Sequence, residues 1–140
     1  MRHPDLLQLS REHHGALKLA RHARRATESG DPDGIGEMAR RVASFFSGEL
    51  EWHFHIEEQG ILVFLKRIGE HDVARRTLAE HEELRKLIGA LSRPDAATLL
   101  SFADLLAAHV RFEERELFPL AEAMLGPTNP CPSAPPGEMN

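Results

Sequence analysis

Residues 39–64 read ARRVASFFSGELEWHFHIEEQGILVF, and this stretch decides which class of fold the chain adopts. Apolar side chains recur at steps of three or four residues, which is the period of one face of an α-helix. The stripe runs through a histidine and a glutamate where apolar residues would be expected: Ala39, Val42, Phe46, Leu50, His53, Glu57, Ile61 and Phe64. The pattern predicts a long amphipathic helix whose buried face includes two polar side chains.

Three further stretches carry the same helical period and the same anomaly, a histidine inside the apolar stripe. β-Branched residues are sparse in them, while Ala, Leu, Arg and Glu dominate, which favours helix over strand. The stripes are Leu6, Leu9, His13, Leu17 and Ala20; then Ala74, Leu78, His81, Leu84, Ile88 and Leu91; and finally Phe102, Leu106, His109, Glu113, Leu117 and Leu120.

Turn-forming residues separate the four stretches. The strongest signal is GDPDG at 30–34, and weaker ones lie at 67–69 and 92–95. Four helices joined by short connections pack antiparallel, so we predict an all-α, up-down-up-down four-helix bundle over residues 1–125. Pro119 lies inside the fourth helix, and we expect it to kink or terminate that helix near its end.

Composition limits the possible classes of protein. The chain has 140 residues, of which 41% are apolar and 28% charged, enough for one domain with a core. It contains no run of about 18 apolar residues, so the sequence predicts no membrane span. A net charge of −5 argues against a general nucleic-acid binder.

The two ends of the chain add three expectations. Residues 1–5 lack the apolar core of a signal peptide, so we expect a cytoplasmic protein. Residues 126–140 are rich in proline and have nothing large to bury, which is typical of an extended or disordered tail. The single cysteine, Cys131, lies in this tail, and we assign it no function.

Burying a polar group on a core face costs free energy unless the group is paired, so we expect these histidines to have polar or ionic partners. Two stripes carry a glutamate four residues after the histidine, namely His53 with Glu57 and His109 with Glu113. One helical turn separates such residues, so imidazole and carboxylate project to the same side and can share one ion.

Spacing places all four histidines at one level of the bundle. Residues at equal height on antiparallel neighbours lie equally far from the turn that connects them. The midpoints between successive histidines (His13, His53, His81, His109) are residues 33, 67 and 95, each in or beside a predicted turn. We therefore expect one polar layer that holds four imidazoles, with both carboxylates one turn away.

An internal repeat strengthens the case for metal binding. Glu12-His13 corresponds to Glu80-His81, and both His53 and His109 begin the pattern His-x-x-x-Glu-Glu. Such symmetry suits two metal ions, each with two histidines, bridged by two glutamates. Imidazole and carboxylate donors suit iron, manganese or zinc, and the lack of thiolate argues against a structural zinc-thiolate site.

The other histidines and the glutamates next to the predicted ligands differ in their position on the helices. His13 is favoured over His14 as the first-helix ligand, because it lies near the centre of the apolar face and matches His81 in the repeat. For Glu58 and Glu114 we expect a solvated position or a role in orienting an imidazole. No metal role is expected for the other histidines, which are His3, His22, His55 and His71.

The motifs resemble those of the hemerythrin-like HHE cation-binding domains, over roughly residues 5–125. The elements that carry the resemblance are Glu12-His13, His53-x-x-x-Glu57, Glu80-His81, and His109-x-x-x-Glu113 followed by Leu117-Phe118-Pro119. The resemblance implies a four-helix bundle with a non-haem diiron centre, oxo- or hydroxo-bridged, that meets O2, NO or peroxide. By position it implies His13 and His53 on one iron, His81 and His109 on the other, and Glu57 and Glu113 as bridges.

Two positions depart from the oxygen-carrying members of that family. The carriers have two histidines one turn apart on the third helix, whereas Thr77 and Arg85 stand four residues before and after His81. The carriers also have an aspartate five residues after the fourth-helix histidine, where this chain has Glu113 after four. Both features resemble the bacterial HHE variants rather than the respiratory carriers.

The leading interpretation is therefore a diiron module that binds or senses O2, NO or a reactive oxygen species, and not an enzyme. A sensor of this kind would act through a separate protein partner. The alternatives are a diiron enzyme of the oxidative or nitrosative stress response, and a redox-inert protein that stores iron or another divalent cation, such as zinc or manganese.

Overall fold

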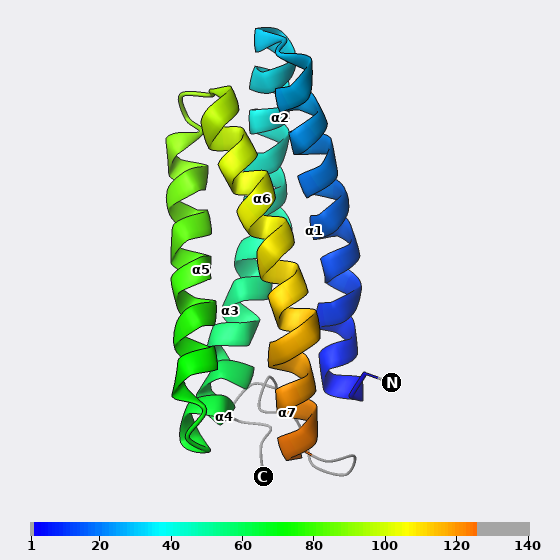
Figure 1. Cartoon of the computed structure of the whole chain (residues 1–140), viewed down its shortest axis with the longest axis vertical. Helices are drawn as coiled ribbons and strands as arrows, with labels where there is room; N and C mark the ends of the chain where they lie inside the picture. The colour runs from blue at the N-terminus through cyan, green and yellow to red at the C-terminus, as the bar shows by residue number, and fades with distance from the viewer. Residues whose placement is uncertain (1, 126–140) are drawn as a thin grey trace.

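The computed structural model describes residues 2–125 and has four antiparallel helical limbs that form an up-down-up-down bundle (Figure 1). The first limb is α1 (Pro4–Ser29) and the third is α5 (His71–Ala90). The second limb comprises α2 (Pro32–Phe45), the π-helical segment η1 (Phe46–Leu50), α3 (Glu51–Gln59) and α4 (Ile61–Arg67). The fourth comprises α6 (Ala96–Phe112), the π-helical segment η2 (Glu113–Leu117) and α7 (Phe118–Leu125). The predicted all-α bundle is confirmed.

The turns form where the sequence places its breakers. Gly30 ends α1 with a φ of 68°, a left-handed conformation that glycine adopts without steric cost. Asp31 then caps α2 by accepting from the backbone N–H groups of Asp33 and Gly34. Asp95 caps α6 in the same way, accepting from the N–H of Thr98 at 2.8 Å. These caps fix where each limb begins, and so fix its register against its neighbours.

Two limbs differ from the uninterrupted helices that the sequence predicts. A π-helical segment precedes α3 in the second limb and another precedes α7 in the fourth. Pro119 does not end the fourth helical limb: it is the second residue of α7, which follows η2 and continues to Leu125. π-Helical turns in α-helices occur often at functional sites, and η2 begins at Glu113.

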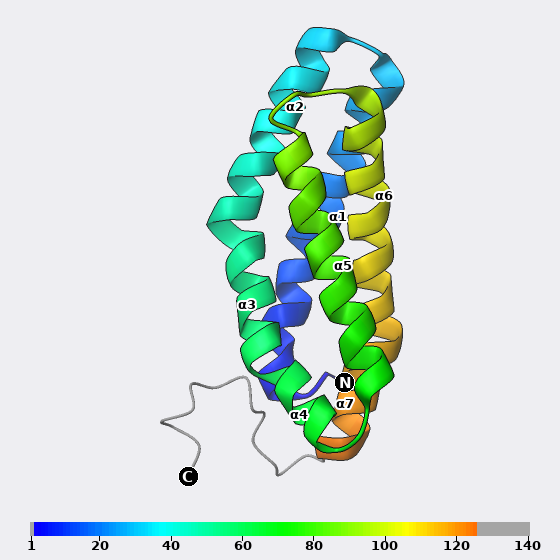
Figure 2. The same ribbon diagram turned by 90° about the vertical axis from the view of Figure 1, so that its left-hand side faces the viewer.

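The core is divided into two apolar clusters. One is formed by α1, α2, η1, α3, α5 and α6 toward the end of the bundle that holds the α1–α2 turn, and the other by the starts of α1 and α5, by α4, and by the fourth limb from Phe112 onward; Figure 2 shows how these elements are arranged. Seven buried polar residues lie among the described residues: His13, His53, Glu57, Thr77, His81, His109 and Glu113. Six of them are the predicted metal ligands.

The described part of the chain ends before the proline-rich stretch. The predicted tail at 126–140, and Cys131 with it, lies outside the described residues. Among the helices of residues 2–125, none combines the length and apolarity needed to cross a bilayer.

Candidate metal centre

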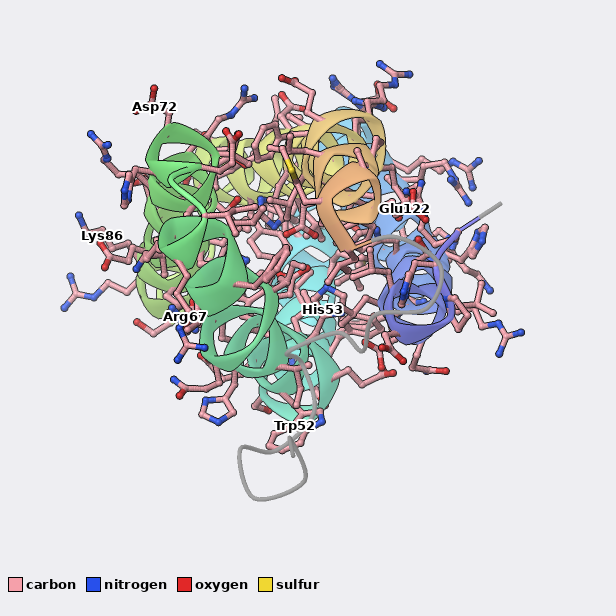
Figure 3. The ribbon with its side chains drawn as sticks, turned by 90° about the horizontal axis from the view of Figure 1, so that it is seen from below. Trp52, His53, Arg67, Asp72, Lys86 and Glu122 are labelled. Atoms are coloured by element: carbon pink, nitrogen blue, oxygen red, sulfur yellow. The ribbon has the colours of Figure 1, made fainter. Side chains whose placement is uncertain are left out.

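The structure brings all six predicted ligand residues into one buried cluster. Their exposed fractions are between 0% and 3%: His13, His53, Glu57, His81, His109 and Glu113. They come from all four limbs, since α1, α3, α5 and α6 each supply a histidine while α3 and η2 supply the glutamates. Figure 3 looks along the bundle and shows His53 pointing into the interior, whereas its neighbour Trp52 points outward.

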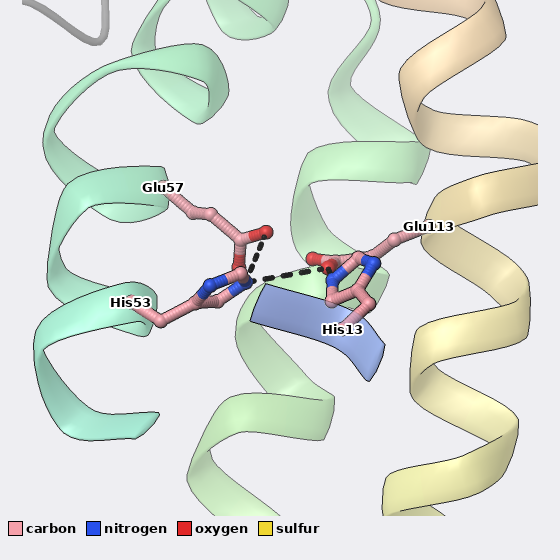
Figure 4. A group of neighbouring side chains, drawn as sticks. All are labelled: His13, His53, Glu57 and Glu113. Carbon is pink, nitrogen blue, oxygen red and sulfur yellow. Dashed lines mark hydrogen bonds and ion pairs between the residues drawn. The ribbon is translucent and has the colours of Figure 1, made fainter. Parts of the chain in front are cut away.

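The cluster consists of two overlapping groups that share both carboxylates. The first group is His13, His53, Glu57 and Glu113, and the second group is Glu57, His81, His109 and Glu113. Within each group, one nitrogen or oxygen atom of every residue lies within 4.8 Å of the others. Figure 4 shows the side chains of the first group pointing toward one another.

Each shared carboxylate presents one oxygen to each group. Towards the first group, Glu113 Oε1 lies 2.8 Å from His13 Nε2, and Glu57 Oε2 lies 3.1 Å from His53 Nε2. Towards the second group, Glu57 Oε1 lies 3.0 Å from His81 Nε2, and Glu113 Oε2 lies 3.2 Å from His109 Nε2. Glu57 and Glu113 thus join the two groups into one cluster.

The second group contains polar atoms whose hydrogen-bonding needs are not met within residues 2–125. The pairs His81–Glu57 and His109–Glu113 lie at ion-pair distances, but their geometry does not meet that of a hydrogen bond. The unpartnered buried atoms are Glu57 Oε1, His81 Nε2, His109 Nε2 and Glu113 Oε2. A buried polar atom without a partner is costly, and a cation that accepts lone pairs from all four would satisfy them. The donor set thus fits a metal ion.

Four outer carboxylates, Glu12, Glu58, Glu80 and Glu114, fix the orientation of the imidazoles. Each accepts a hydrogen bond from a histidine Nδ1 on a neighbouring limb at 2.7 Å; the pairs are His13–Glu114, His53–Glu12, His81–Glu58 and His109–Glu80. With Nδ1 used in this way, every Nε2 faces the centre of the cluster. This is the carboxylate–histidine pairing that commonly supports protein metal sites.

Sequence reasoning identified these outer carboxylates only in part. Glu12 and Glu80 stood out as the residues before His13 and His81, but no contact was predicted for them. Glu58 and Glu114 were expected to be solvated or to orient an imidazole, and the structure gives them the orienting contact. The available signal was their adjacency to the cluster residues in both halves of the repeat.

The other histidines lie outside the two groups. His14 is exposed on α1, so of the two neighbouring histidines only His13 faces the cluster. His55 and His71 are exposed as well. His3 and His22 are members of neither group.

The charges in the cluster compensate one another. Burial alone would raise the pKa of Glu113, but the charge of His109 and close contacts with His109, His13 and His53 hold it well below its usual range. Conversely, burial alone would lower the pKa of His109, yet the charge and close contact of Glu113 and the hydrogen bond to Glu80 raise it to about 10. Glu113 therefore stays ionised in the protein interior.

Two of the imidazoles stack on phenylalanine rings. Phe54 stacks on His81 with ring centroids 3.9 Å apart and an interplanar angle of 14°. Phe118 stacks on His13 at 5.4 Å with an angle of 7°. An arginine lies over each phenylalanine, Arg85 over Phe54 and Arg2 over Phe118, and each also binds the carboxylate that supports the stacked histidine.

A comparison with protein families agrees with this geometry. The model of the Hemerythrin HHE cation binding domain matches residues 6–121, which is most of the chain. Comparison with curated proteins and with solved structures gave no match. The family and the buried histidine and glutamate groups together indicate a metal-binding protein. The chain belongs to the hemerythrin HHE cation-binding domain family.

Proposed function

We propose that the chain holds two iron ions in the cluster and uses them to bind or sense O2, NO or a reactive oxygen species. The observation that carries this proposal is the sharing of Glu57 and Glu113 between two four-residue groups. A single ion would need only one such group.

The proposed ligand assignment follows the two groups. His13 and His53 serve one ion, His81 and His109 serve the other, and Glu57 and Glu113 reach both. Each histidine binds through Nε2, because its Nδ1 already donates to an outer carboxylate. Every ion then has two imidazoles and two carboxylate oxygens, which leaves room at an iron for a small ligand.

Iron is proposed over zinc and manganese for chemical reasons. The donor set suits all three metals, and the resemblance to hemerythrin-like proteins favours iron. A pair of ferrous ions supplies two electrons and open coordination positions, which is what a diatomic gas or peroxide requires. The apolar clusters on both sides of the polar layer limit the access of water to it.

Binding or sensing is favoured over enzymatic oxidation by the residues around the cluster. Four imidazoles and two carboxylates make a less anionic donor set than the carboxylate-rich sites of ferritin-like bundles, which disfavours high-valent iron. The chain also contains no tyrosine that could store an oxidising equivalent.

Anaerobic reconstitution with Fe²⁺ followed by elemental analysis tests the stoichiometry. We expect two ions per chain, and we expect His13→Ala to lower this number while His14→Ala, its exposed neighbour, retains two. A reproducible single ion in the wild-type chain, or equal losses in the two variants, would contradict the proposal.

Absorption spectra of the loaded chain distinguish the functional classes. A charge-transfer band that appears with O2 or NO and disappears when the gas is removed supports binding or sensing. Rapid turnover of peroxide would favour an enzyme of the stress response. The absence of any band would favour a redox-inert cation store.

A further inference from the structure

The two groups of the cluster differ in the state of their donor atoms. In the first group, His13 Nε2 hydrogen-bonds Glu113 Oε1 at 2.8 Å and His53 Nε2 hydrogen-bonds Glu57 Oε2 at 3.1 Å. In the second group the corresponding four atoms have no hydrogen-bond partner within the described chain. An ion entering the first group must replace two hydrogen bonds, whereas an ion entering the second group must replace two ion pairs, at 3.0 and 3.2 Å, that lack hydrogen-bond geometry.

The outer carboxylates of the two groups differ in how far they are exposed to solvent. Those of the second group, Glu58 and Glu80, have side chains only 18% and 17% exposed. Those of the first group, Glu12 and Glu114, are 38% and 31% exposed. The hydrogen bonds that orient the second-group histidines are therefore better shielded from water.

The support behind these carboxylates also differs. An arginine binds Glu58, Glu80 and Glu114: Arg85 at 2.9 Å, Arg76 at 3.2 Å and Arg2 at 2.9 Å. Glu12 instead receives a 3.4 Å hydrogen bond from the neutral side chain of Gln8, and among the described residues its ion pair is with His53 and not with an arginine or lysine. An uncharged donor at this distance holds a carboxylate less firmly than an arginine does.

The internal repeat shows that this difference is a substitution at one position. Arg76 stands four residues before Glu80, in the turn that precedes His81. Gln8 stands four residues before Glu12, in the turn that precedes His13. Gln8 thus occupies, in the first half of the repeat, the place that Arg76 occupies in the second half.

A surface hollow adjoins the weakly held carboxylate. It has a volume of about 260 Å³ and opens between α1 and α3; its lining is Asp5, Gln8, Leu9, Glu12, Trp52 and Ile56. Glu12 separates this hollow from His53, to which it is hydrogen-bonded at 2.7 Å. Solvent therefore reaches the support of a first-group histidine from this side.

We propose that the two metal positions are unequal: the second group binds the first ion and retains it, and the first group binds the second ion and exchanges it through the hollow beside Glu12. This inference rests on the proposed two-ion function. It assigns to Gln8 the role of a positioning residue that keeps the first-group ion exchangeable.

Titration of the metal-free full chain with Co²⁺, followed by calorimetry and by its visible absorption, tests the inequality. We expect two binding steps whose affinities differ by at least about tenfold, the range over which outer partners of metal ligands act. A chelator added to the doubly loaded chain should remove the two ions in two phases, with one ion per phase.

A reciprocal pair of variants at exposed positions tests which group is which. Gln8→Arg should strengthen the second binding step and slow the fast phase of release. Arg76→Gln should weaken the first step and accelerate the slow phase. Each change should be roughly 3- to 10-fold, below the 10- to 100-fold effect of removing an outer partner itself. Circular dichroism of both metal-free variants verifies that the bundle is intact.

The outcomes separate this inference from the function it rests on. Two ions bound with equal affinity and released in one phase would overturn the inference and leave the two-ion function standing. The same holds if Gln8→Arg alters the first step rather than the second. Binding of only one ion to the wild-type chain would overturn the two-ion function, and the inference with it.

Discussion

Each cluster histidine is held between two carboxylates, one at each ring nitrogen. For His81, Glu58 accepts from Nδ1 at 2.7 Å, and Glu57 lies 3.0 Å from Nε2. The outer contact determines which nitrogen carries the proton and which nitrogen faces the centre. A partner on the neighbouring limb thus leaves the Nε2 of a core-facing histidine available as a donor atom.

Loss of one outer carboxylate should weaken metal binding without removing a ligand. We expect Glu80→Gln to lower the affinity for Fe²⁺ or Co²⁺ about 10- to 100-fold, because an amide is a weaker acceptor for His109 Nδ1 than a carboxylate. Calorimetric titration measures the change. Glu82→Gln, at an exposed position on the same helix, is the control, and equal effects of the two substitutions would contradict an orienting role for Glu80.

Trp52 should not store an oxidising equivalent, although it precedes His53 in the sequence. Its side chain is 62% exposed and stacks on His55 at 5.5 Å, on the side away from the cluster. We expect freeze-quench electron paramagnetic resonance, recorded after the ferrous chain is mixed with O2, to detect no stoichiometric tryptophan radical. A radical that Trp52→Phe abolishes would overturn this prediction and favour the enzyme hypothesis.

At the scale of the elements, the sequence predicts the layer of histidines but not the connections between limbs. The equal distances of the histidines from the turns were sufficient to place four imidazoles at one level. The pairing of Glu12 with His53, or of Glu58 with His81, depends on how neighbouring helices rotate against each other. A period of three or four residues does not specify that rotation to within one hydrogen bond.

The π-helical segments were also beyond sequence reasoning. The apolar stripe of the second limb keeps its regular steps through Phe46 and Leu50, so nothing in its period distinguishes η1 from an α-helix. In the fourth limb, Pro119 indicated a disturbance but not its form. Local backbone geometry of this kind is settled by tertiary packing, which overrides the helical period.

The cap of α6 should contribute to stability through the register of the limb that carries His109. Asp95 accepts from the backbone N–H of Thr98 at 2.8 Å and from its hydroxyl at 2.8 Å. We expect Asp95→Ala to lower the melting temperature by a few degrees, because helix N–H groups lose their acceptor. Thermal unfolding followed by circular dichroism measures this, with Glu37→Ala on the exposed face of α2 as the control. An unchanged melting temperature in both variants would show that the cap is dispensable.

At the scale of the whole molecule, the buried charges should make the stability of the metal-free chain depend on pH in both directions. Burial alone would raise the pKa of Glu58, but hydrogen bonds with His81 and Arg85 lower it to about 2. The stability that Glu58 gives the folded chain is therefore fully present above pH 4.5, and it is lost as the pH falls toward 2. The pKa of His109 is raised to about 10. The stability that protonated His109 gives the folded chain is therefore fully present below pH 6.5, and it is lost as the pH rises through 10.

The melting temperature of the metal-free chain should accordingly be highest between about pH 4.5 and 6.5, the interval bounded by the ordinary pKa values of the two groups. Thermal unfolding in chelator, recorded from pH 3 to pH 10, measures the profile. A melting temperature that rises steadily from pH 6 to pH 9 would contradict the assignment of the protons to the histidines.

Removal of metal should destabilise the bundle as a whole, because the cluster joins all four limbs between the two apolar clusters of the core. Protons on the histidines compensate the charge of Glu113 when no ion is bound, so the metal-free chain is expected to fold. An ion that binds only the folded state adds about 2.7 kcal/mol at a hundred times its dissociation constant, by mass action. The loaded chain should therefore melt several degrees above the same chain in chelator under anaerobic conditions. His13→Ala should narrow that difference while His14→Ala should not, and equal melting temperatures in saturating Fe²⁺ and in chelator would mean that no ion is bound at the centre of the bundle.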